Sequence, residues 1–163
     1  MWILRPIRLK NCAHLRQFIL RLVTQYFVVK LIVALFLAFV LQDIDNTEII
    51  VTHPLAIIVI FVFVVPIVET LLLQTFMIEL SRRLRYPISV QFCAGMIPFA
   101  LLHFQAGIAT GIAAGVIGGV FFSYAYLECR GDSWWKATGV TCVTHHIHNV
   151  ICTPIMYAMA SFV

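Results

Sequence analysis

Four polar side chains lie within otherwise apolar stretches of the sequence, and their types suit hydrolysis. They are Glu69, His103, His145 and Asn149. A carboxylate can take a proton from water, while an imidazole holds that water or shares the proton. A second imidazole and a carboxamide can donate hydrogen bonds to an oxyanion. This combination predicts a site able to hydrolyse an amide bond without a covalent intermediate.

The spacing of the histidines in 143-VTHHIHNV-150 decides which of them share a helix face. His145 and Asn149 are four residues apart, so a helix places them on the same side. His148 follows His145 by three residues and is expected to line the same wall. His146 is rotated about 100° from His145 and is expected to pack elsewhere.

Two other chemistries would use overlapping residues. Cys142 precedes His145 by three residues and is a candidate nucleophile. Two imidazoles and a carboxylate could also bind zinc. However, the sequence has no HExxH motif, and the ligands would come from three separate helices. We therefore expect neither a metal nor another cofactor.

Membrane-spanning helices must position these residues, because the chain is too apolar for a soluble domain. Its 163 residues are 62% hydrophobic and 11% charged, with a mean hydropathy of +0.99. Soluble domains have roughly 45–50% apolar and about 25% charged residues. We expect an all-α, polytopic transmembrane bundle in which residues 1–163 form a single domain.

Hydropathy predicts about five spans after a basic amphipathic segment over residues 1–25 that lies at the membrane interface. The spans are expected at about 26–41, 54–80, 88–105, 107–127 and 136–160. Lys30 falls near the inner end of the first span, where its side chain is expected to snorkel toward the interface. In the fourth span, glycines recur every four residues from Gly107 to Gly119, which predicts close helix packing.

The basic residues predict the orientation of the chain. Five lysines and arginines precede residue 25, and Arg82, Arg83 and Arg85 share one short loop. By the positive-inside rule, the N-terminus and this arginine loop face the cytoplasm. The net charge of +4 thus reflects membrane topology, and no nucleic-acid partner is expected. The small size of the chain favours a multi-pass protein of a prokaryotic inner membrane.

Three short motifs resemble, in order, those of the CPBP family of intramembrane glutamic endopeptidases, which includes the CAAX prenyl endopeptidases. That family has EExxxR on one helix, FxxxH on the next and HxxxN on a later one. Glu69 begins the first motif here. The second runs from Phe99 to His103, and the third from His145 to Asn149.

The resemblance covers about residues 60–155, the expected catalytic core, and it implies a role for each side chain. Glu69 and His103 would activate the water. His145 and Asn149 would stabilise the oxyanion. The partners would be the lipid bilayer and a membrane-associated peptide or protein, cut within a helical cavity.

The first motif departs from the family pattern beside Glu69. Thr70 replaces the second glutamate, and Gln74 replaces the arginine. A buried ion pair can be exchanged for a neutral pair at little cost, so Thr70 and Gln74 are expected to form a hydrogen-bonded brace. The lost charges also favour an alternative, a non-catalytic relative that binds a membrane partner in an immunity or sorting system. A proton-coupled carrier is a third possibility, disfavoured because the sequence has no evident inverted repeat.

Overall fold

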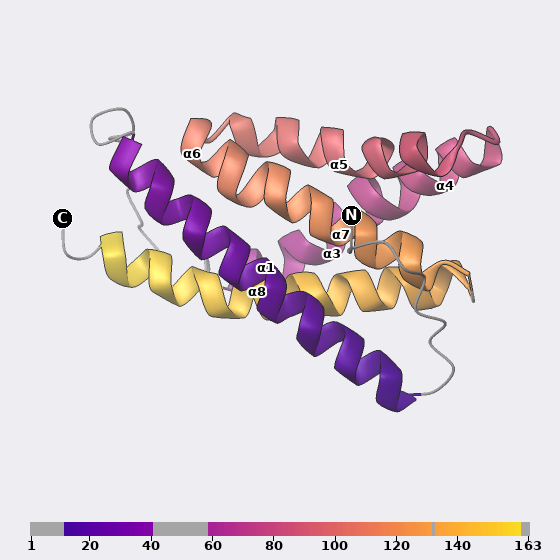
Figure 1. Ribbon diagram of the computed structural model, residues 1–163, viewed down its shortest axis with the longest axis horizontal. Helices are drawn as coiled ribbons and strands as arrows, with labels where there is room; N and C mark the ends of the chain where they lie inside the picture. The colour runs from indigo at the N-terminus through magenta and orange to yellow at the C-terminus, as the bar shows by residue number, and fades with distance from the viewer. Residues whose placement is uncertain (1–11, 41–58, 132, 161–163) are drawn as a thin grey trace.

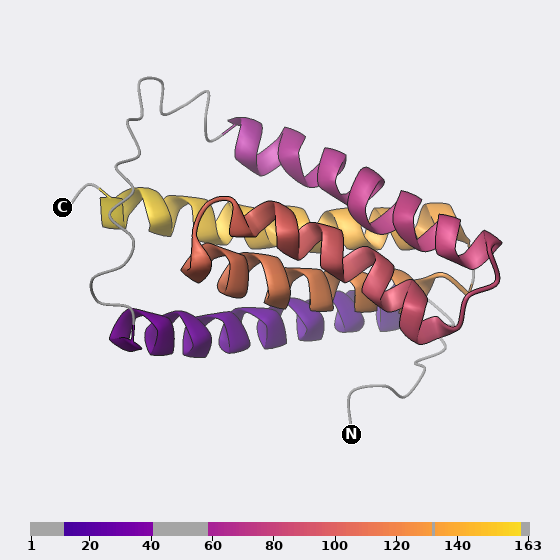
Figure 2. The ribbon, with the colours of Figure 1, turned by 90° about the horizontal axis from the view of Figure 1, so that it is seen from above.

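The computed structural model describes residues 12–40, 59–131 and 133–160. Within these ranges every regular element is a helix. The helices form five rods whose directions alternate through the bundle (Figure 1, Figure 2). The predicted all-α membrane bundle is therefore confirmed.

Three rods contain helices that are long and apolar enough to cross a membrane. They are His14–Leu37, Ile60–Arg83 and Ile108–Cys129. The third rod, α5 (Ile88–Phe104), is a shorter apolar helix. The last rod, α8 (Trp134–Ala160), has 27 residues, which corresponds to a length of about 40 Å.

The first rod, α1 (Cys12–Val40), is one continuous helix. The boundary expected near residue 25, between an interfacial segment and the first span, is therefore not a break. The candidate span within α1 already begins at His14. Residues 1–11 of the expected interfacial segment lie outside the described residues.

Regular α-helix alternates with wider π-helical turns in the second rod. Its segments are η1 (Ile60–Val64), α3 (Val65–Glu69), η2 (Thr70–Phe76) and α4 (Met77–Arg83). Pro66 lies in the first turn of α3, where a missing N–H is tolerated best. Glu69 is thus the last residue of a short α-helical segment that lies between two π-helical segments. Single π-helical turns within α-helices are frequent at functional sites. Residues 54–58 of the predicted span lie outside the described residues.

The fourth rod approaches α5 closely through its glycines. It consists of α6 (Ile108–Thr110), η3 (Gly111–Val116) and α7 (Ile117–Cys129). A Cβ atom at Gly115 would lie 2.8 Å from Cβ of His103 and 2.9 Å from the carbonyl oxygen of Ala100. The turn into this rod needs Gly107, whose φ of 108° lies in the left-handed region. The predicted close packing is confirmed.

One face of α1 packs against α7 and α8. Phe18, Leu22 and Tyr26 recur every four residues along α1, and all three are buried. Phe18 and Leu22 join the cluster formed with α7 and α8, and Tyr26 stacks on the Phe121 ring of α7. Figure 1 shows α1 crossing over α8.

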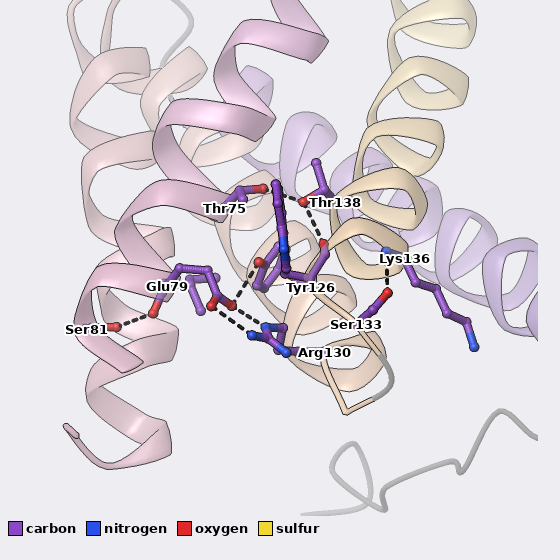
Figure 3. Close-up of polar contacts among 10 residues, drawn as sticks. Thr75, Glu79, Ser81, Tyr126, Arg130, Ser133, Lys136 and Thr138 are labelled. Carbon is purple, nitrogen blue, oxygen red and sulfur yellow. Dashed lines mark hydrogen bonds and ion pairs between the residues drawn. The ribbon is translucent and has the colours of Figure 1, made fainter. Parts of the chain in front are cut away.

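A polar cluster joins three rods at the end of the bundle that holds the arginine loop (Figure 3). Arg130 donates to the carboxylate of Glu79 through Nε and, at 2.9 Å, through Nη2. The Tyr126 hydroxyl donates to the same carboxylate at 3.0 Å. The bonds to Glu79 raise the pKa of Arg130, so its guanidinium stays charged. One turn further into the bundle, the hydroxyls of Thr75 and Thr138 lie 2.9 Å apart.

Candidate active site

Glu69 and His145 come from different rods and face each other inside the bundle. Oε2 of Glu69 lies 3.5 Å from Nε2 of His145. Their side chains are 13% and 3% exposed, so bulk water has little access to either. Helical rise places Glu69 about 20 Å along its rod from the arginine loop. The structure therefore brings two of the predicted residues together at the depth of the bilayer interior.

Aromatic rings hold the imidazole of His145 in place. Phe122 stacks on it with ring centroids 4.2 Å apart and 27° between the planes. Phe99 meets it edge-on at 5.7 Å. Its Nε2 faces Glu69, whereas its Nδ1 is buried with no hydrogen-bond partner among the described residues. Packing thus fixes the ring, and one nitrogen is left for a water molecule or a substrate group.

His103 lies near the C-terminal end of α5 and uses one ring nitrogen structurally. Its Nδ1 is 2.9 Å from the carbonyl oxygen of Phe99, on whose ring it stacks at 4.4 Å. A carbonyl oxygen can only accept a hydrogen bond, so Nδ1 carries the proton and Nε2 keeps its lone pair. The Phe99 ring contacts both His103, at 4.4 Å, and His145, at 5.7 Å. A basic nitrogen therefore lies in the neighbourhood of the Glu69–His145 pair.

Asn149 lies one turn after His145 on α8, and its carboxamide is partly engaged. Nδ2 donates a 2.8 Å hydrogen bond to the carbonyl oxygen of Phe61 in η1. This bond joins α8 to the rod that carries Glu69. Because the amide nitrogen has two hydrogens, a second donor remains for another acceptor.

The other two histidines of α8 have different surroundings. His148 is buried and contacts α1, where its Nε2 lies 3.4 Å from the Tyr26 hydroxyl and the two rings stack at 4.2 Å. His146 instead bonds within its own helix, through Nδ1, to the carbonyl oxygen of Cys142 at 2.8 Å. His148 therefore links the site to α1, whereas His146 lies on another face.

The brace expected between Thr70 and Gln74 is not formed. Both side chains are fully buried, yet neither the Thr70 hydroxyl nor either amide atom of Gln74 has a hydrogen-bond partner among the described residues. The expectation assumed α-helical turns, but both residues lie in the π-helical η2. A π-helical turn is wider and changes which side chains stand above one another. The prediction of a hydrogen-bonded neutral pair is therefore wrong.

Lys30 does not snorkel to the interface, so this prediction is also wrong. Its Nζ lies 3.0 Å from Nε2 of His148 and 3.8 Å from Sγ of Cys152. Because the span in α1 begins at His14, Lys30 lies deep in the helix and not near the inner end.

Sequence reasoning missed two further residues around the site, Tyr26 and Phe122. Tyr26 supports His148, and Phe122 supports His145. Tyr26 and Lys30 are four residues apart in an apolar helix, a spacing that could have identified a shared inward face. Phe122 carries no comparable signal, because aromatic residues are frequent throughout the chain.

The donors of the site suit proton transfer. Among the described residues, no three His, Cys, Asp or Glu side chains group closely enough to hold a metal ion. What the site does offer is a carboxylate against an imidazole, a nearby basic nitrogen and an amide donor. Such a set can move a proton from water and stabilise developing negative charge.

The apolar helical bundle with a buried polar site defines a polytopic membrane protein. Residues 51–156 match the family described as type II CAAX prenyl endopeptidase Rce1-like, and the chain belongs to this family. The resemblance seen in the sequence is thereby confirmed. No curated protein and no solved structure matches the chain. As a member of this family, the chain belongs to the general class of CAAX-type membrane proteases, which act on peptide substrates.

Proposed function

We propose that this chain is an intramembrane endopeptidase in which Glu69 and His103 activate water while His145 and Asn149 stabilise the oxyanion. The substrate is a membrane-associated peptide or protein. The observation that carries the proposal is the 3.5 Å approach of Glu69 to His145 from separate rods. A carboxylate that faces only an imidazole keeps lone pairs with which to accept a proton from water.

In the proposed first step, the Glu69 carboxylate removes a proton from a water molecule that also bonds to Nε2 of His103. The water oxygen attacks the scissile carbonyl carbon, and the C=O electron pair moves onto the carbonyl oxygen. Protonation of Glu69 weakens its attraction for His145. The Nε2–H of His145 then becomes available to the oxyanion, together with the second N–H of Asn149.

In the second step the oxyanion collapses and the C–N bond breaks. Glu69 returns its proton to the leaving nitrogen. The products are a carboxylic acid and an amine, and Glu69 ends as the carboxylate with which it began. No covalent intermediate forms, so Cys142 is not required.

A non-catalytic binding protein is the second candidate. Thr70 and Gln74 favour it, because they are buried without a hydrogen-bond partner among the described residues and the charges that accompany the first glutamate in the family are absent here. Such a protein would hold a peptide in the same interior and release it uncut.

A cleavage assay on the full-length chain in lipid nanodiscs separates the two candidates. We would use two quenched fluorescent peptides, one ending in a prenylated CAAX sequence and one held by a different lipid anchor. The wild-type chain is expected to cleave at least one. Glu69→Gln is expected to lower kcat by about a thousandfold while peptide binding persists. His146→Ala, which changes a neighbouring histidine on another helix face, is the control and is expected to remain active.

Two results would contradict the endopeptidase proposal. One is a wild-type chain that binds both peptides and cleaves neither, which supports the binding protein. The other is a Glu69→Gln chain that cleaves within about twofold of the wild-type rate.

The same proposal places the chain in a prokaryotic inner membrane with its N-terminus in the cytoplasm. The start of α1, the arginine loop and the turn after α7 lie at one end of the bundle (Figure 2), which supports a common face for all three. Protease added to the outside of spheroplasts should leave an N-terminal tag intact. Removal of the tag would show that the N-terminus faces the outside and would contradict this orientation.

A further inference from the structure

The arginine loop forms an ordered turn between α4 and α5. The N–H of Arg85 donates to the carbonyl oxygen of Arg82 at 2.9 Å. The N–H of Tyr86 donates to the carbonyl oxygen of Ser81 at 3.1 Å. These two bonds make a Schellman motif, which satisfies carbonyl groups at a helix end. From the other side, Nε2 of Gln91 donates to the carbonyl oxygen of Tyr86 at 2.7 Å, so the loop has a fixed backbone.

Arg85 occupies the position at which a Schellman motif usually has glycine. Its φ of 60° lies in the left-handed region, and it is the one non-glycine residue with positive φ in the described part of the chain. This conformation is unfavourable for a side chain with a Cβ atom. The helix dipole favours basic residues in the last turn, which accounts for Arg82 and Arg83. It does not explain why the strained position has an arginine, so we look for a ligand of that side chain.

The positive charge of the arginine loop has no matching acid nearby in the sequence. All three arginines are exposed. No aspartate or glutamate occurs between Glu79 and Glu128. Glu79 itself accepts hydrogen bonds from the guanidinium of Arg130, which matches its charge. The loop therefore presents an excess of positive charge to its surroundings.

The position of the arginine loop in the bundle indicates which anions it meets. The candidate span of the second rod, Ile60–Arg83, ends in this loop. Trp134 and Trp135 begin α8 at the same end of the bundle (Figure 2), and their rings stack with centroids 3.7 Å apart. Tyr86 in the loop is 50% exposed. Tryptophan and tyrosine are enriched where a protein meets lipid headgroups, so the three arginines lie at the level of the phosphates.

We propose that the arginine loop binds the headgroup of an anionic phospholipid, with the guanidinium of Arg85 on the phosphate. A guanidinium can form two parallel N–H···O bonds with a phosphate group. Anionic lipids attract basic segments at the membrane surface. The loop joins the rod that carries Glu69 to α5, which carries His103. A bound lipid therefore also holds these two rods together, whether or not the chain cleaves peptides.

Lipid binding to the full-length chain in detergent tests this inference. Fluorescently labelled phosphatidylglycerol is the probe, and labelled phosphatidylcholine is the neutral comparison. We expect the wild type to prefer phosphatidylglycerol. Each arginine near an anionic surface contributes about fivefold in affinity, so Arg85→Gly should weaken phosphatidylglycerol binding about fivefold. The same substitution relieves the strain at φ of 60° and should raise the unfolding temperature by about 2–4 °C.

Arg16→Gln is the matched control, because Arg16 is an exposed arginine of α1 outside the loop. It is expected to bind phosphatidylglycerol as the wild type does. Equal affinity of the wild type for the two lipids would overturn the inference, as would an Arg85→Gly chain that keeps its affinity for phosphatidylglycerol. An equal loss in Arg16→Gln would show unspecific charge attraction and overturn it too. Displacement of the lipid by inorganic phosphate at similar concentrations would assign the site to a free anion and not to a lipid.

Discussion

Glu69 and Glu79 lie ten residues apart on the same helical rod, yet their carboxylates have different partners. Glu79 receives two bonds from the guanidinium of Arg130 and one from the Tyr126 hydroxyl (Figure 3). Glu69 faces the imidazole of His145 at 3.5 Å, and its neighbours Thr70 and Gln74 have no partners among the described residues.

The difference separates an acid that joins helices from the acid that we propose to be reactive. The Glu79 carboxylate accepts three hydrogen bonds, so most of its about four lone pairs are occupied, and these bonds join helices. A carboxylate beside a single imidazole remains able to accept a proton. The Glu79 carboxylate is thus held by hydrogen bonds from two side chains, whereas Thr70 and Gln74 beside Glu69 have no hydrogen-bond partners among the described residues. Incomplete pairing is expected where a substrate or water completes the set.

The largest expected effect on activity beyond Glu69 itself is at His145. His145→Ala removes the imidazole that faces Glu69 and is expected to lower kcat by about 10²–10³-fold. Peptide cleavage in nanodiscs measures it, with His146→Ala as the matched control. Equal losses of kcat in the two variants would show that these histidines affect folding and not the reaction. The contact with His145 would then no longer distinguish Glu69 chemically from Glu79.

Displacing His103 is expected to have the next largest effect. A Cβ atom at Gly115 would meet Cβ of His103 and the backbone of Ala100, so Gly115→Ala must push α5 away. A shift of about 1 Å at a catalytic group can cost up to about a hundredfold in rate. The same substitution at Gly139, where nothing lies within 4 Å of the added atom, should leave the rate unchanged. Full activity in the Gly115 variant would place His103 outside the mechanism.

Changing Glu79 is expected to affect stability and not chemistry. Glu79→Gln leaves the half-buried guanidinium of Arg130 without its counter-charge and should lower the free energy of unfolding by about 1–3 kcal/mol. Thermal unfolding in detergent would show a lower midpoint, while cleavage by the folded chain stays near wild type. Unchanged stability would mean that this ion pair does not hold the rods together.

The smallest expected effect comes from the unpartnered residues beside Glu69. Thr70→Val with Gln74→Leu removes buried polar atoms that make no hydrogen bond within the part of the chain that the structure describes, so stability should rise by about 1 kcal/mol. Thr75→Val is the control, because its hydroxyl is paired with Thr138 and its loss should destabilise. If the double variant proves less stable than wild type, water or a partner satisfies these atoms in the membrane.

Much of the fold could be predicted from the sequence because hydropathy and charge act locally. The limits expected for the third span, 88–105, agree with α5 within one residue. The glycine repeat correctly indicated close packing, since a missing Cβ has the same consequence in any helix. Family membership also followed from three motifs in order.

The remaining errors have physical causes that lie outside local sequence. A pattern based on 3.6 residues per turn does not predict the π-helical η2. It therefore predicts a hydrogen bond between Thr70 and Gln74, whose side chains have no partner among the described residues. The contact of Lys30 with His148 joins residues 118 positions apart, and apolar helices do not specify which neighbour they will meet. The pairing of Glu79 with Arg130 is equally long-range.

The most direct test of the central claim measures Glu69→Gln and Glu79→Gln side by side, recording peptide cleavage and thermal unfolding for each. We expect an inactive Glu69 variant that unfolds at the wild-type temperature, and an active Glu79 variant that unfolds at a lower temperature. A Glu69 variant that is active, or one that is inactive only because it no longer folds, would contradict it.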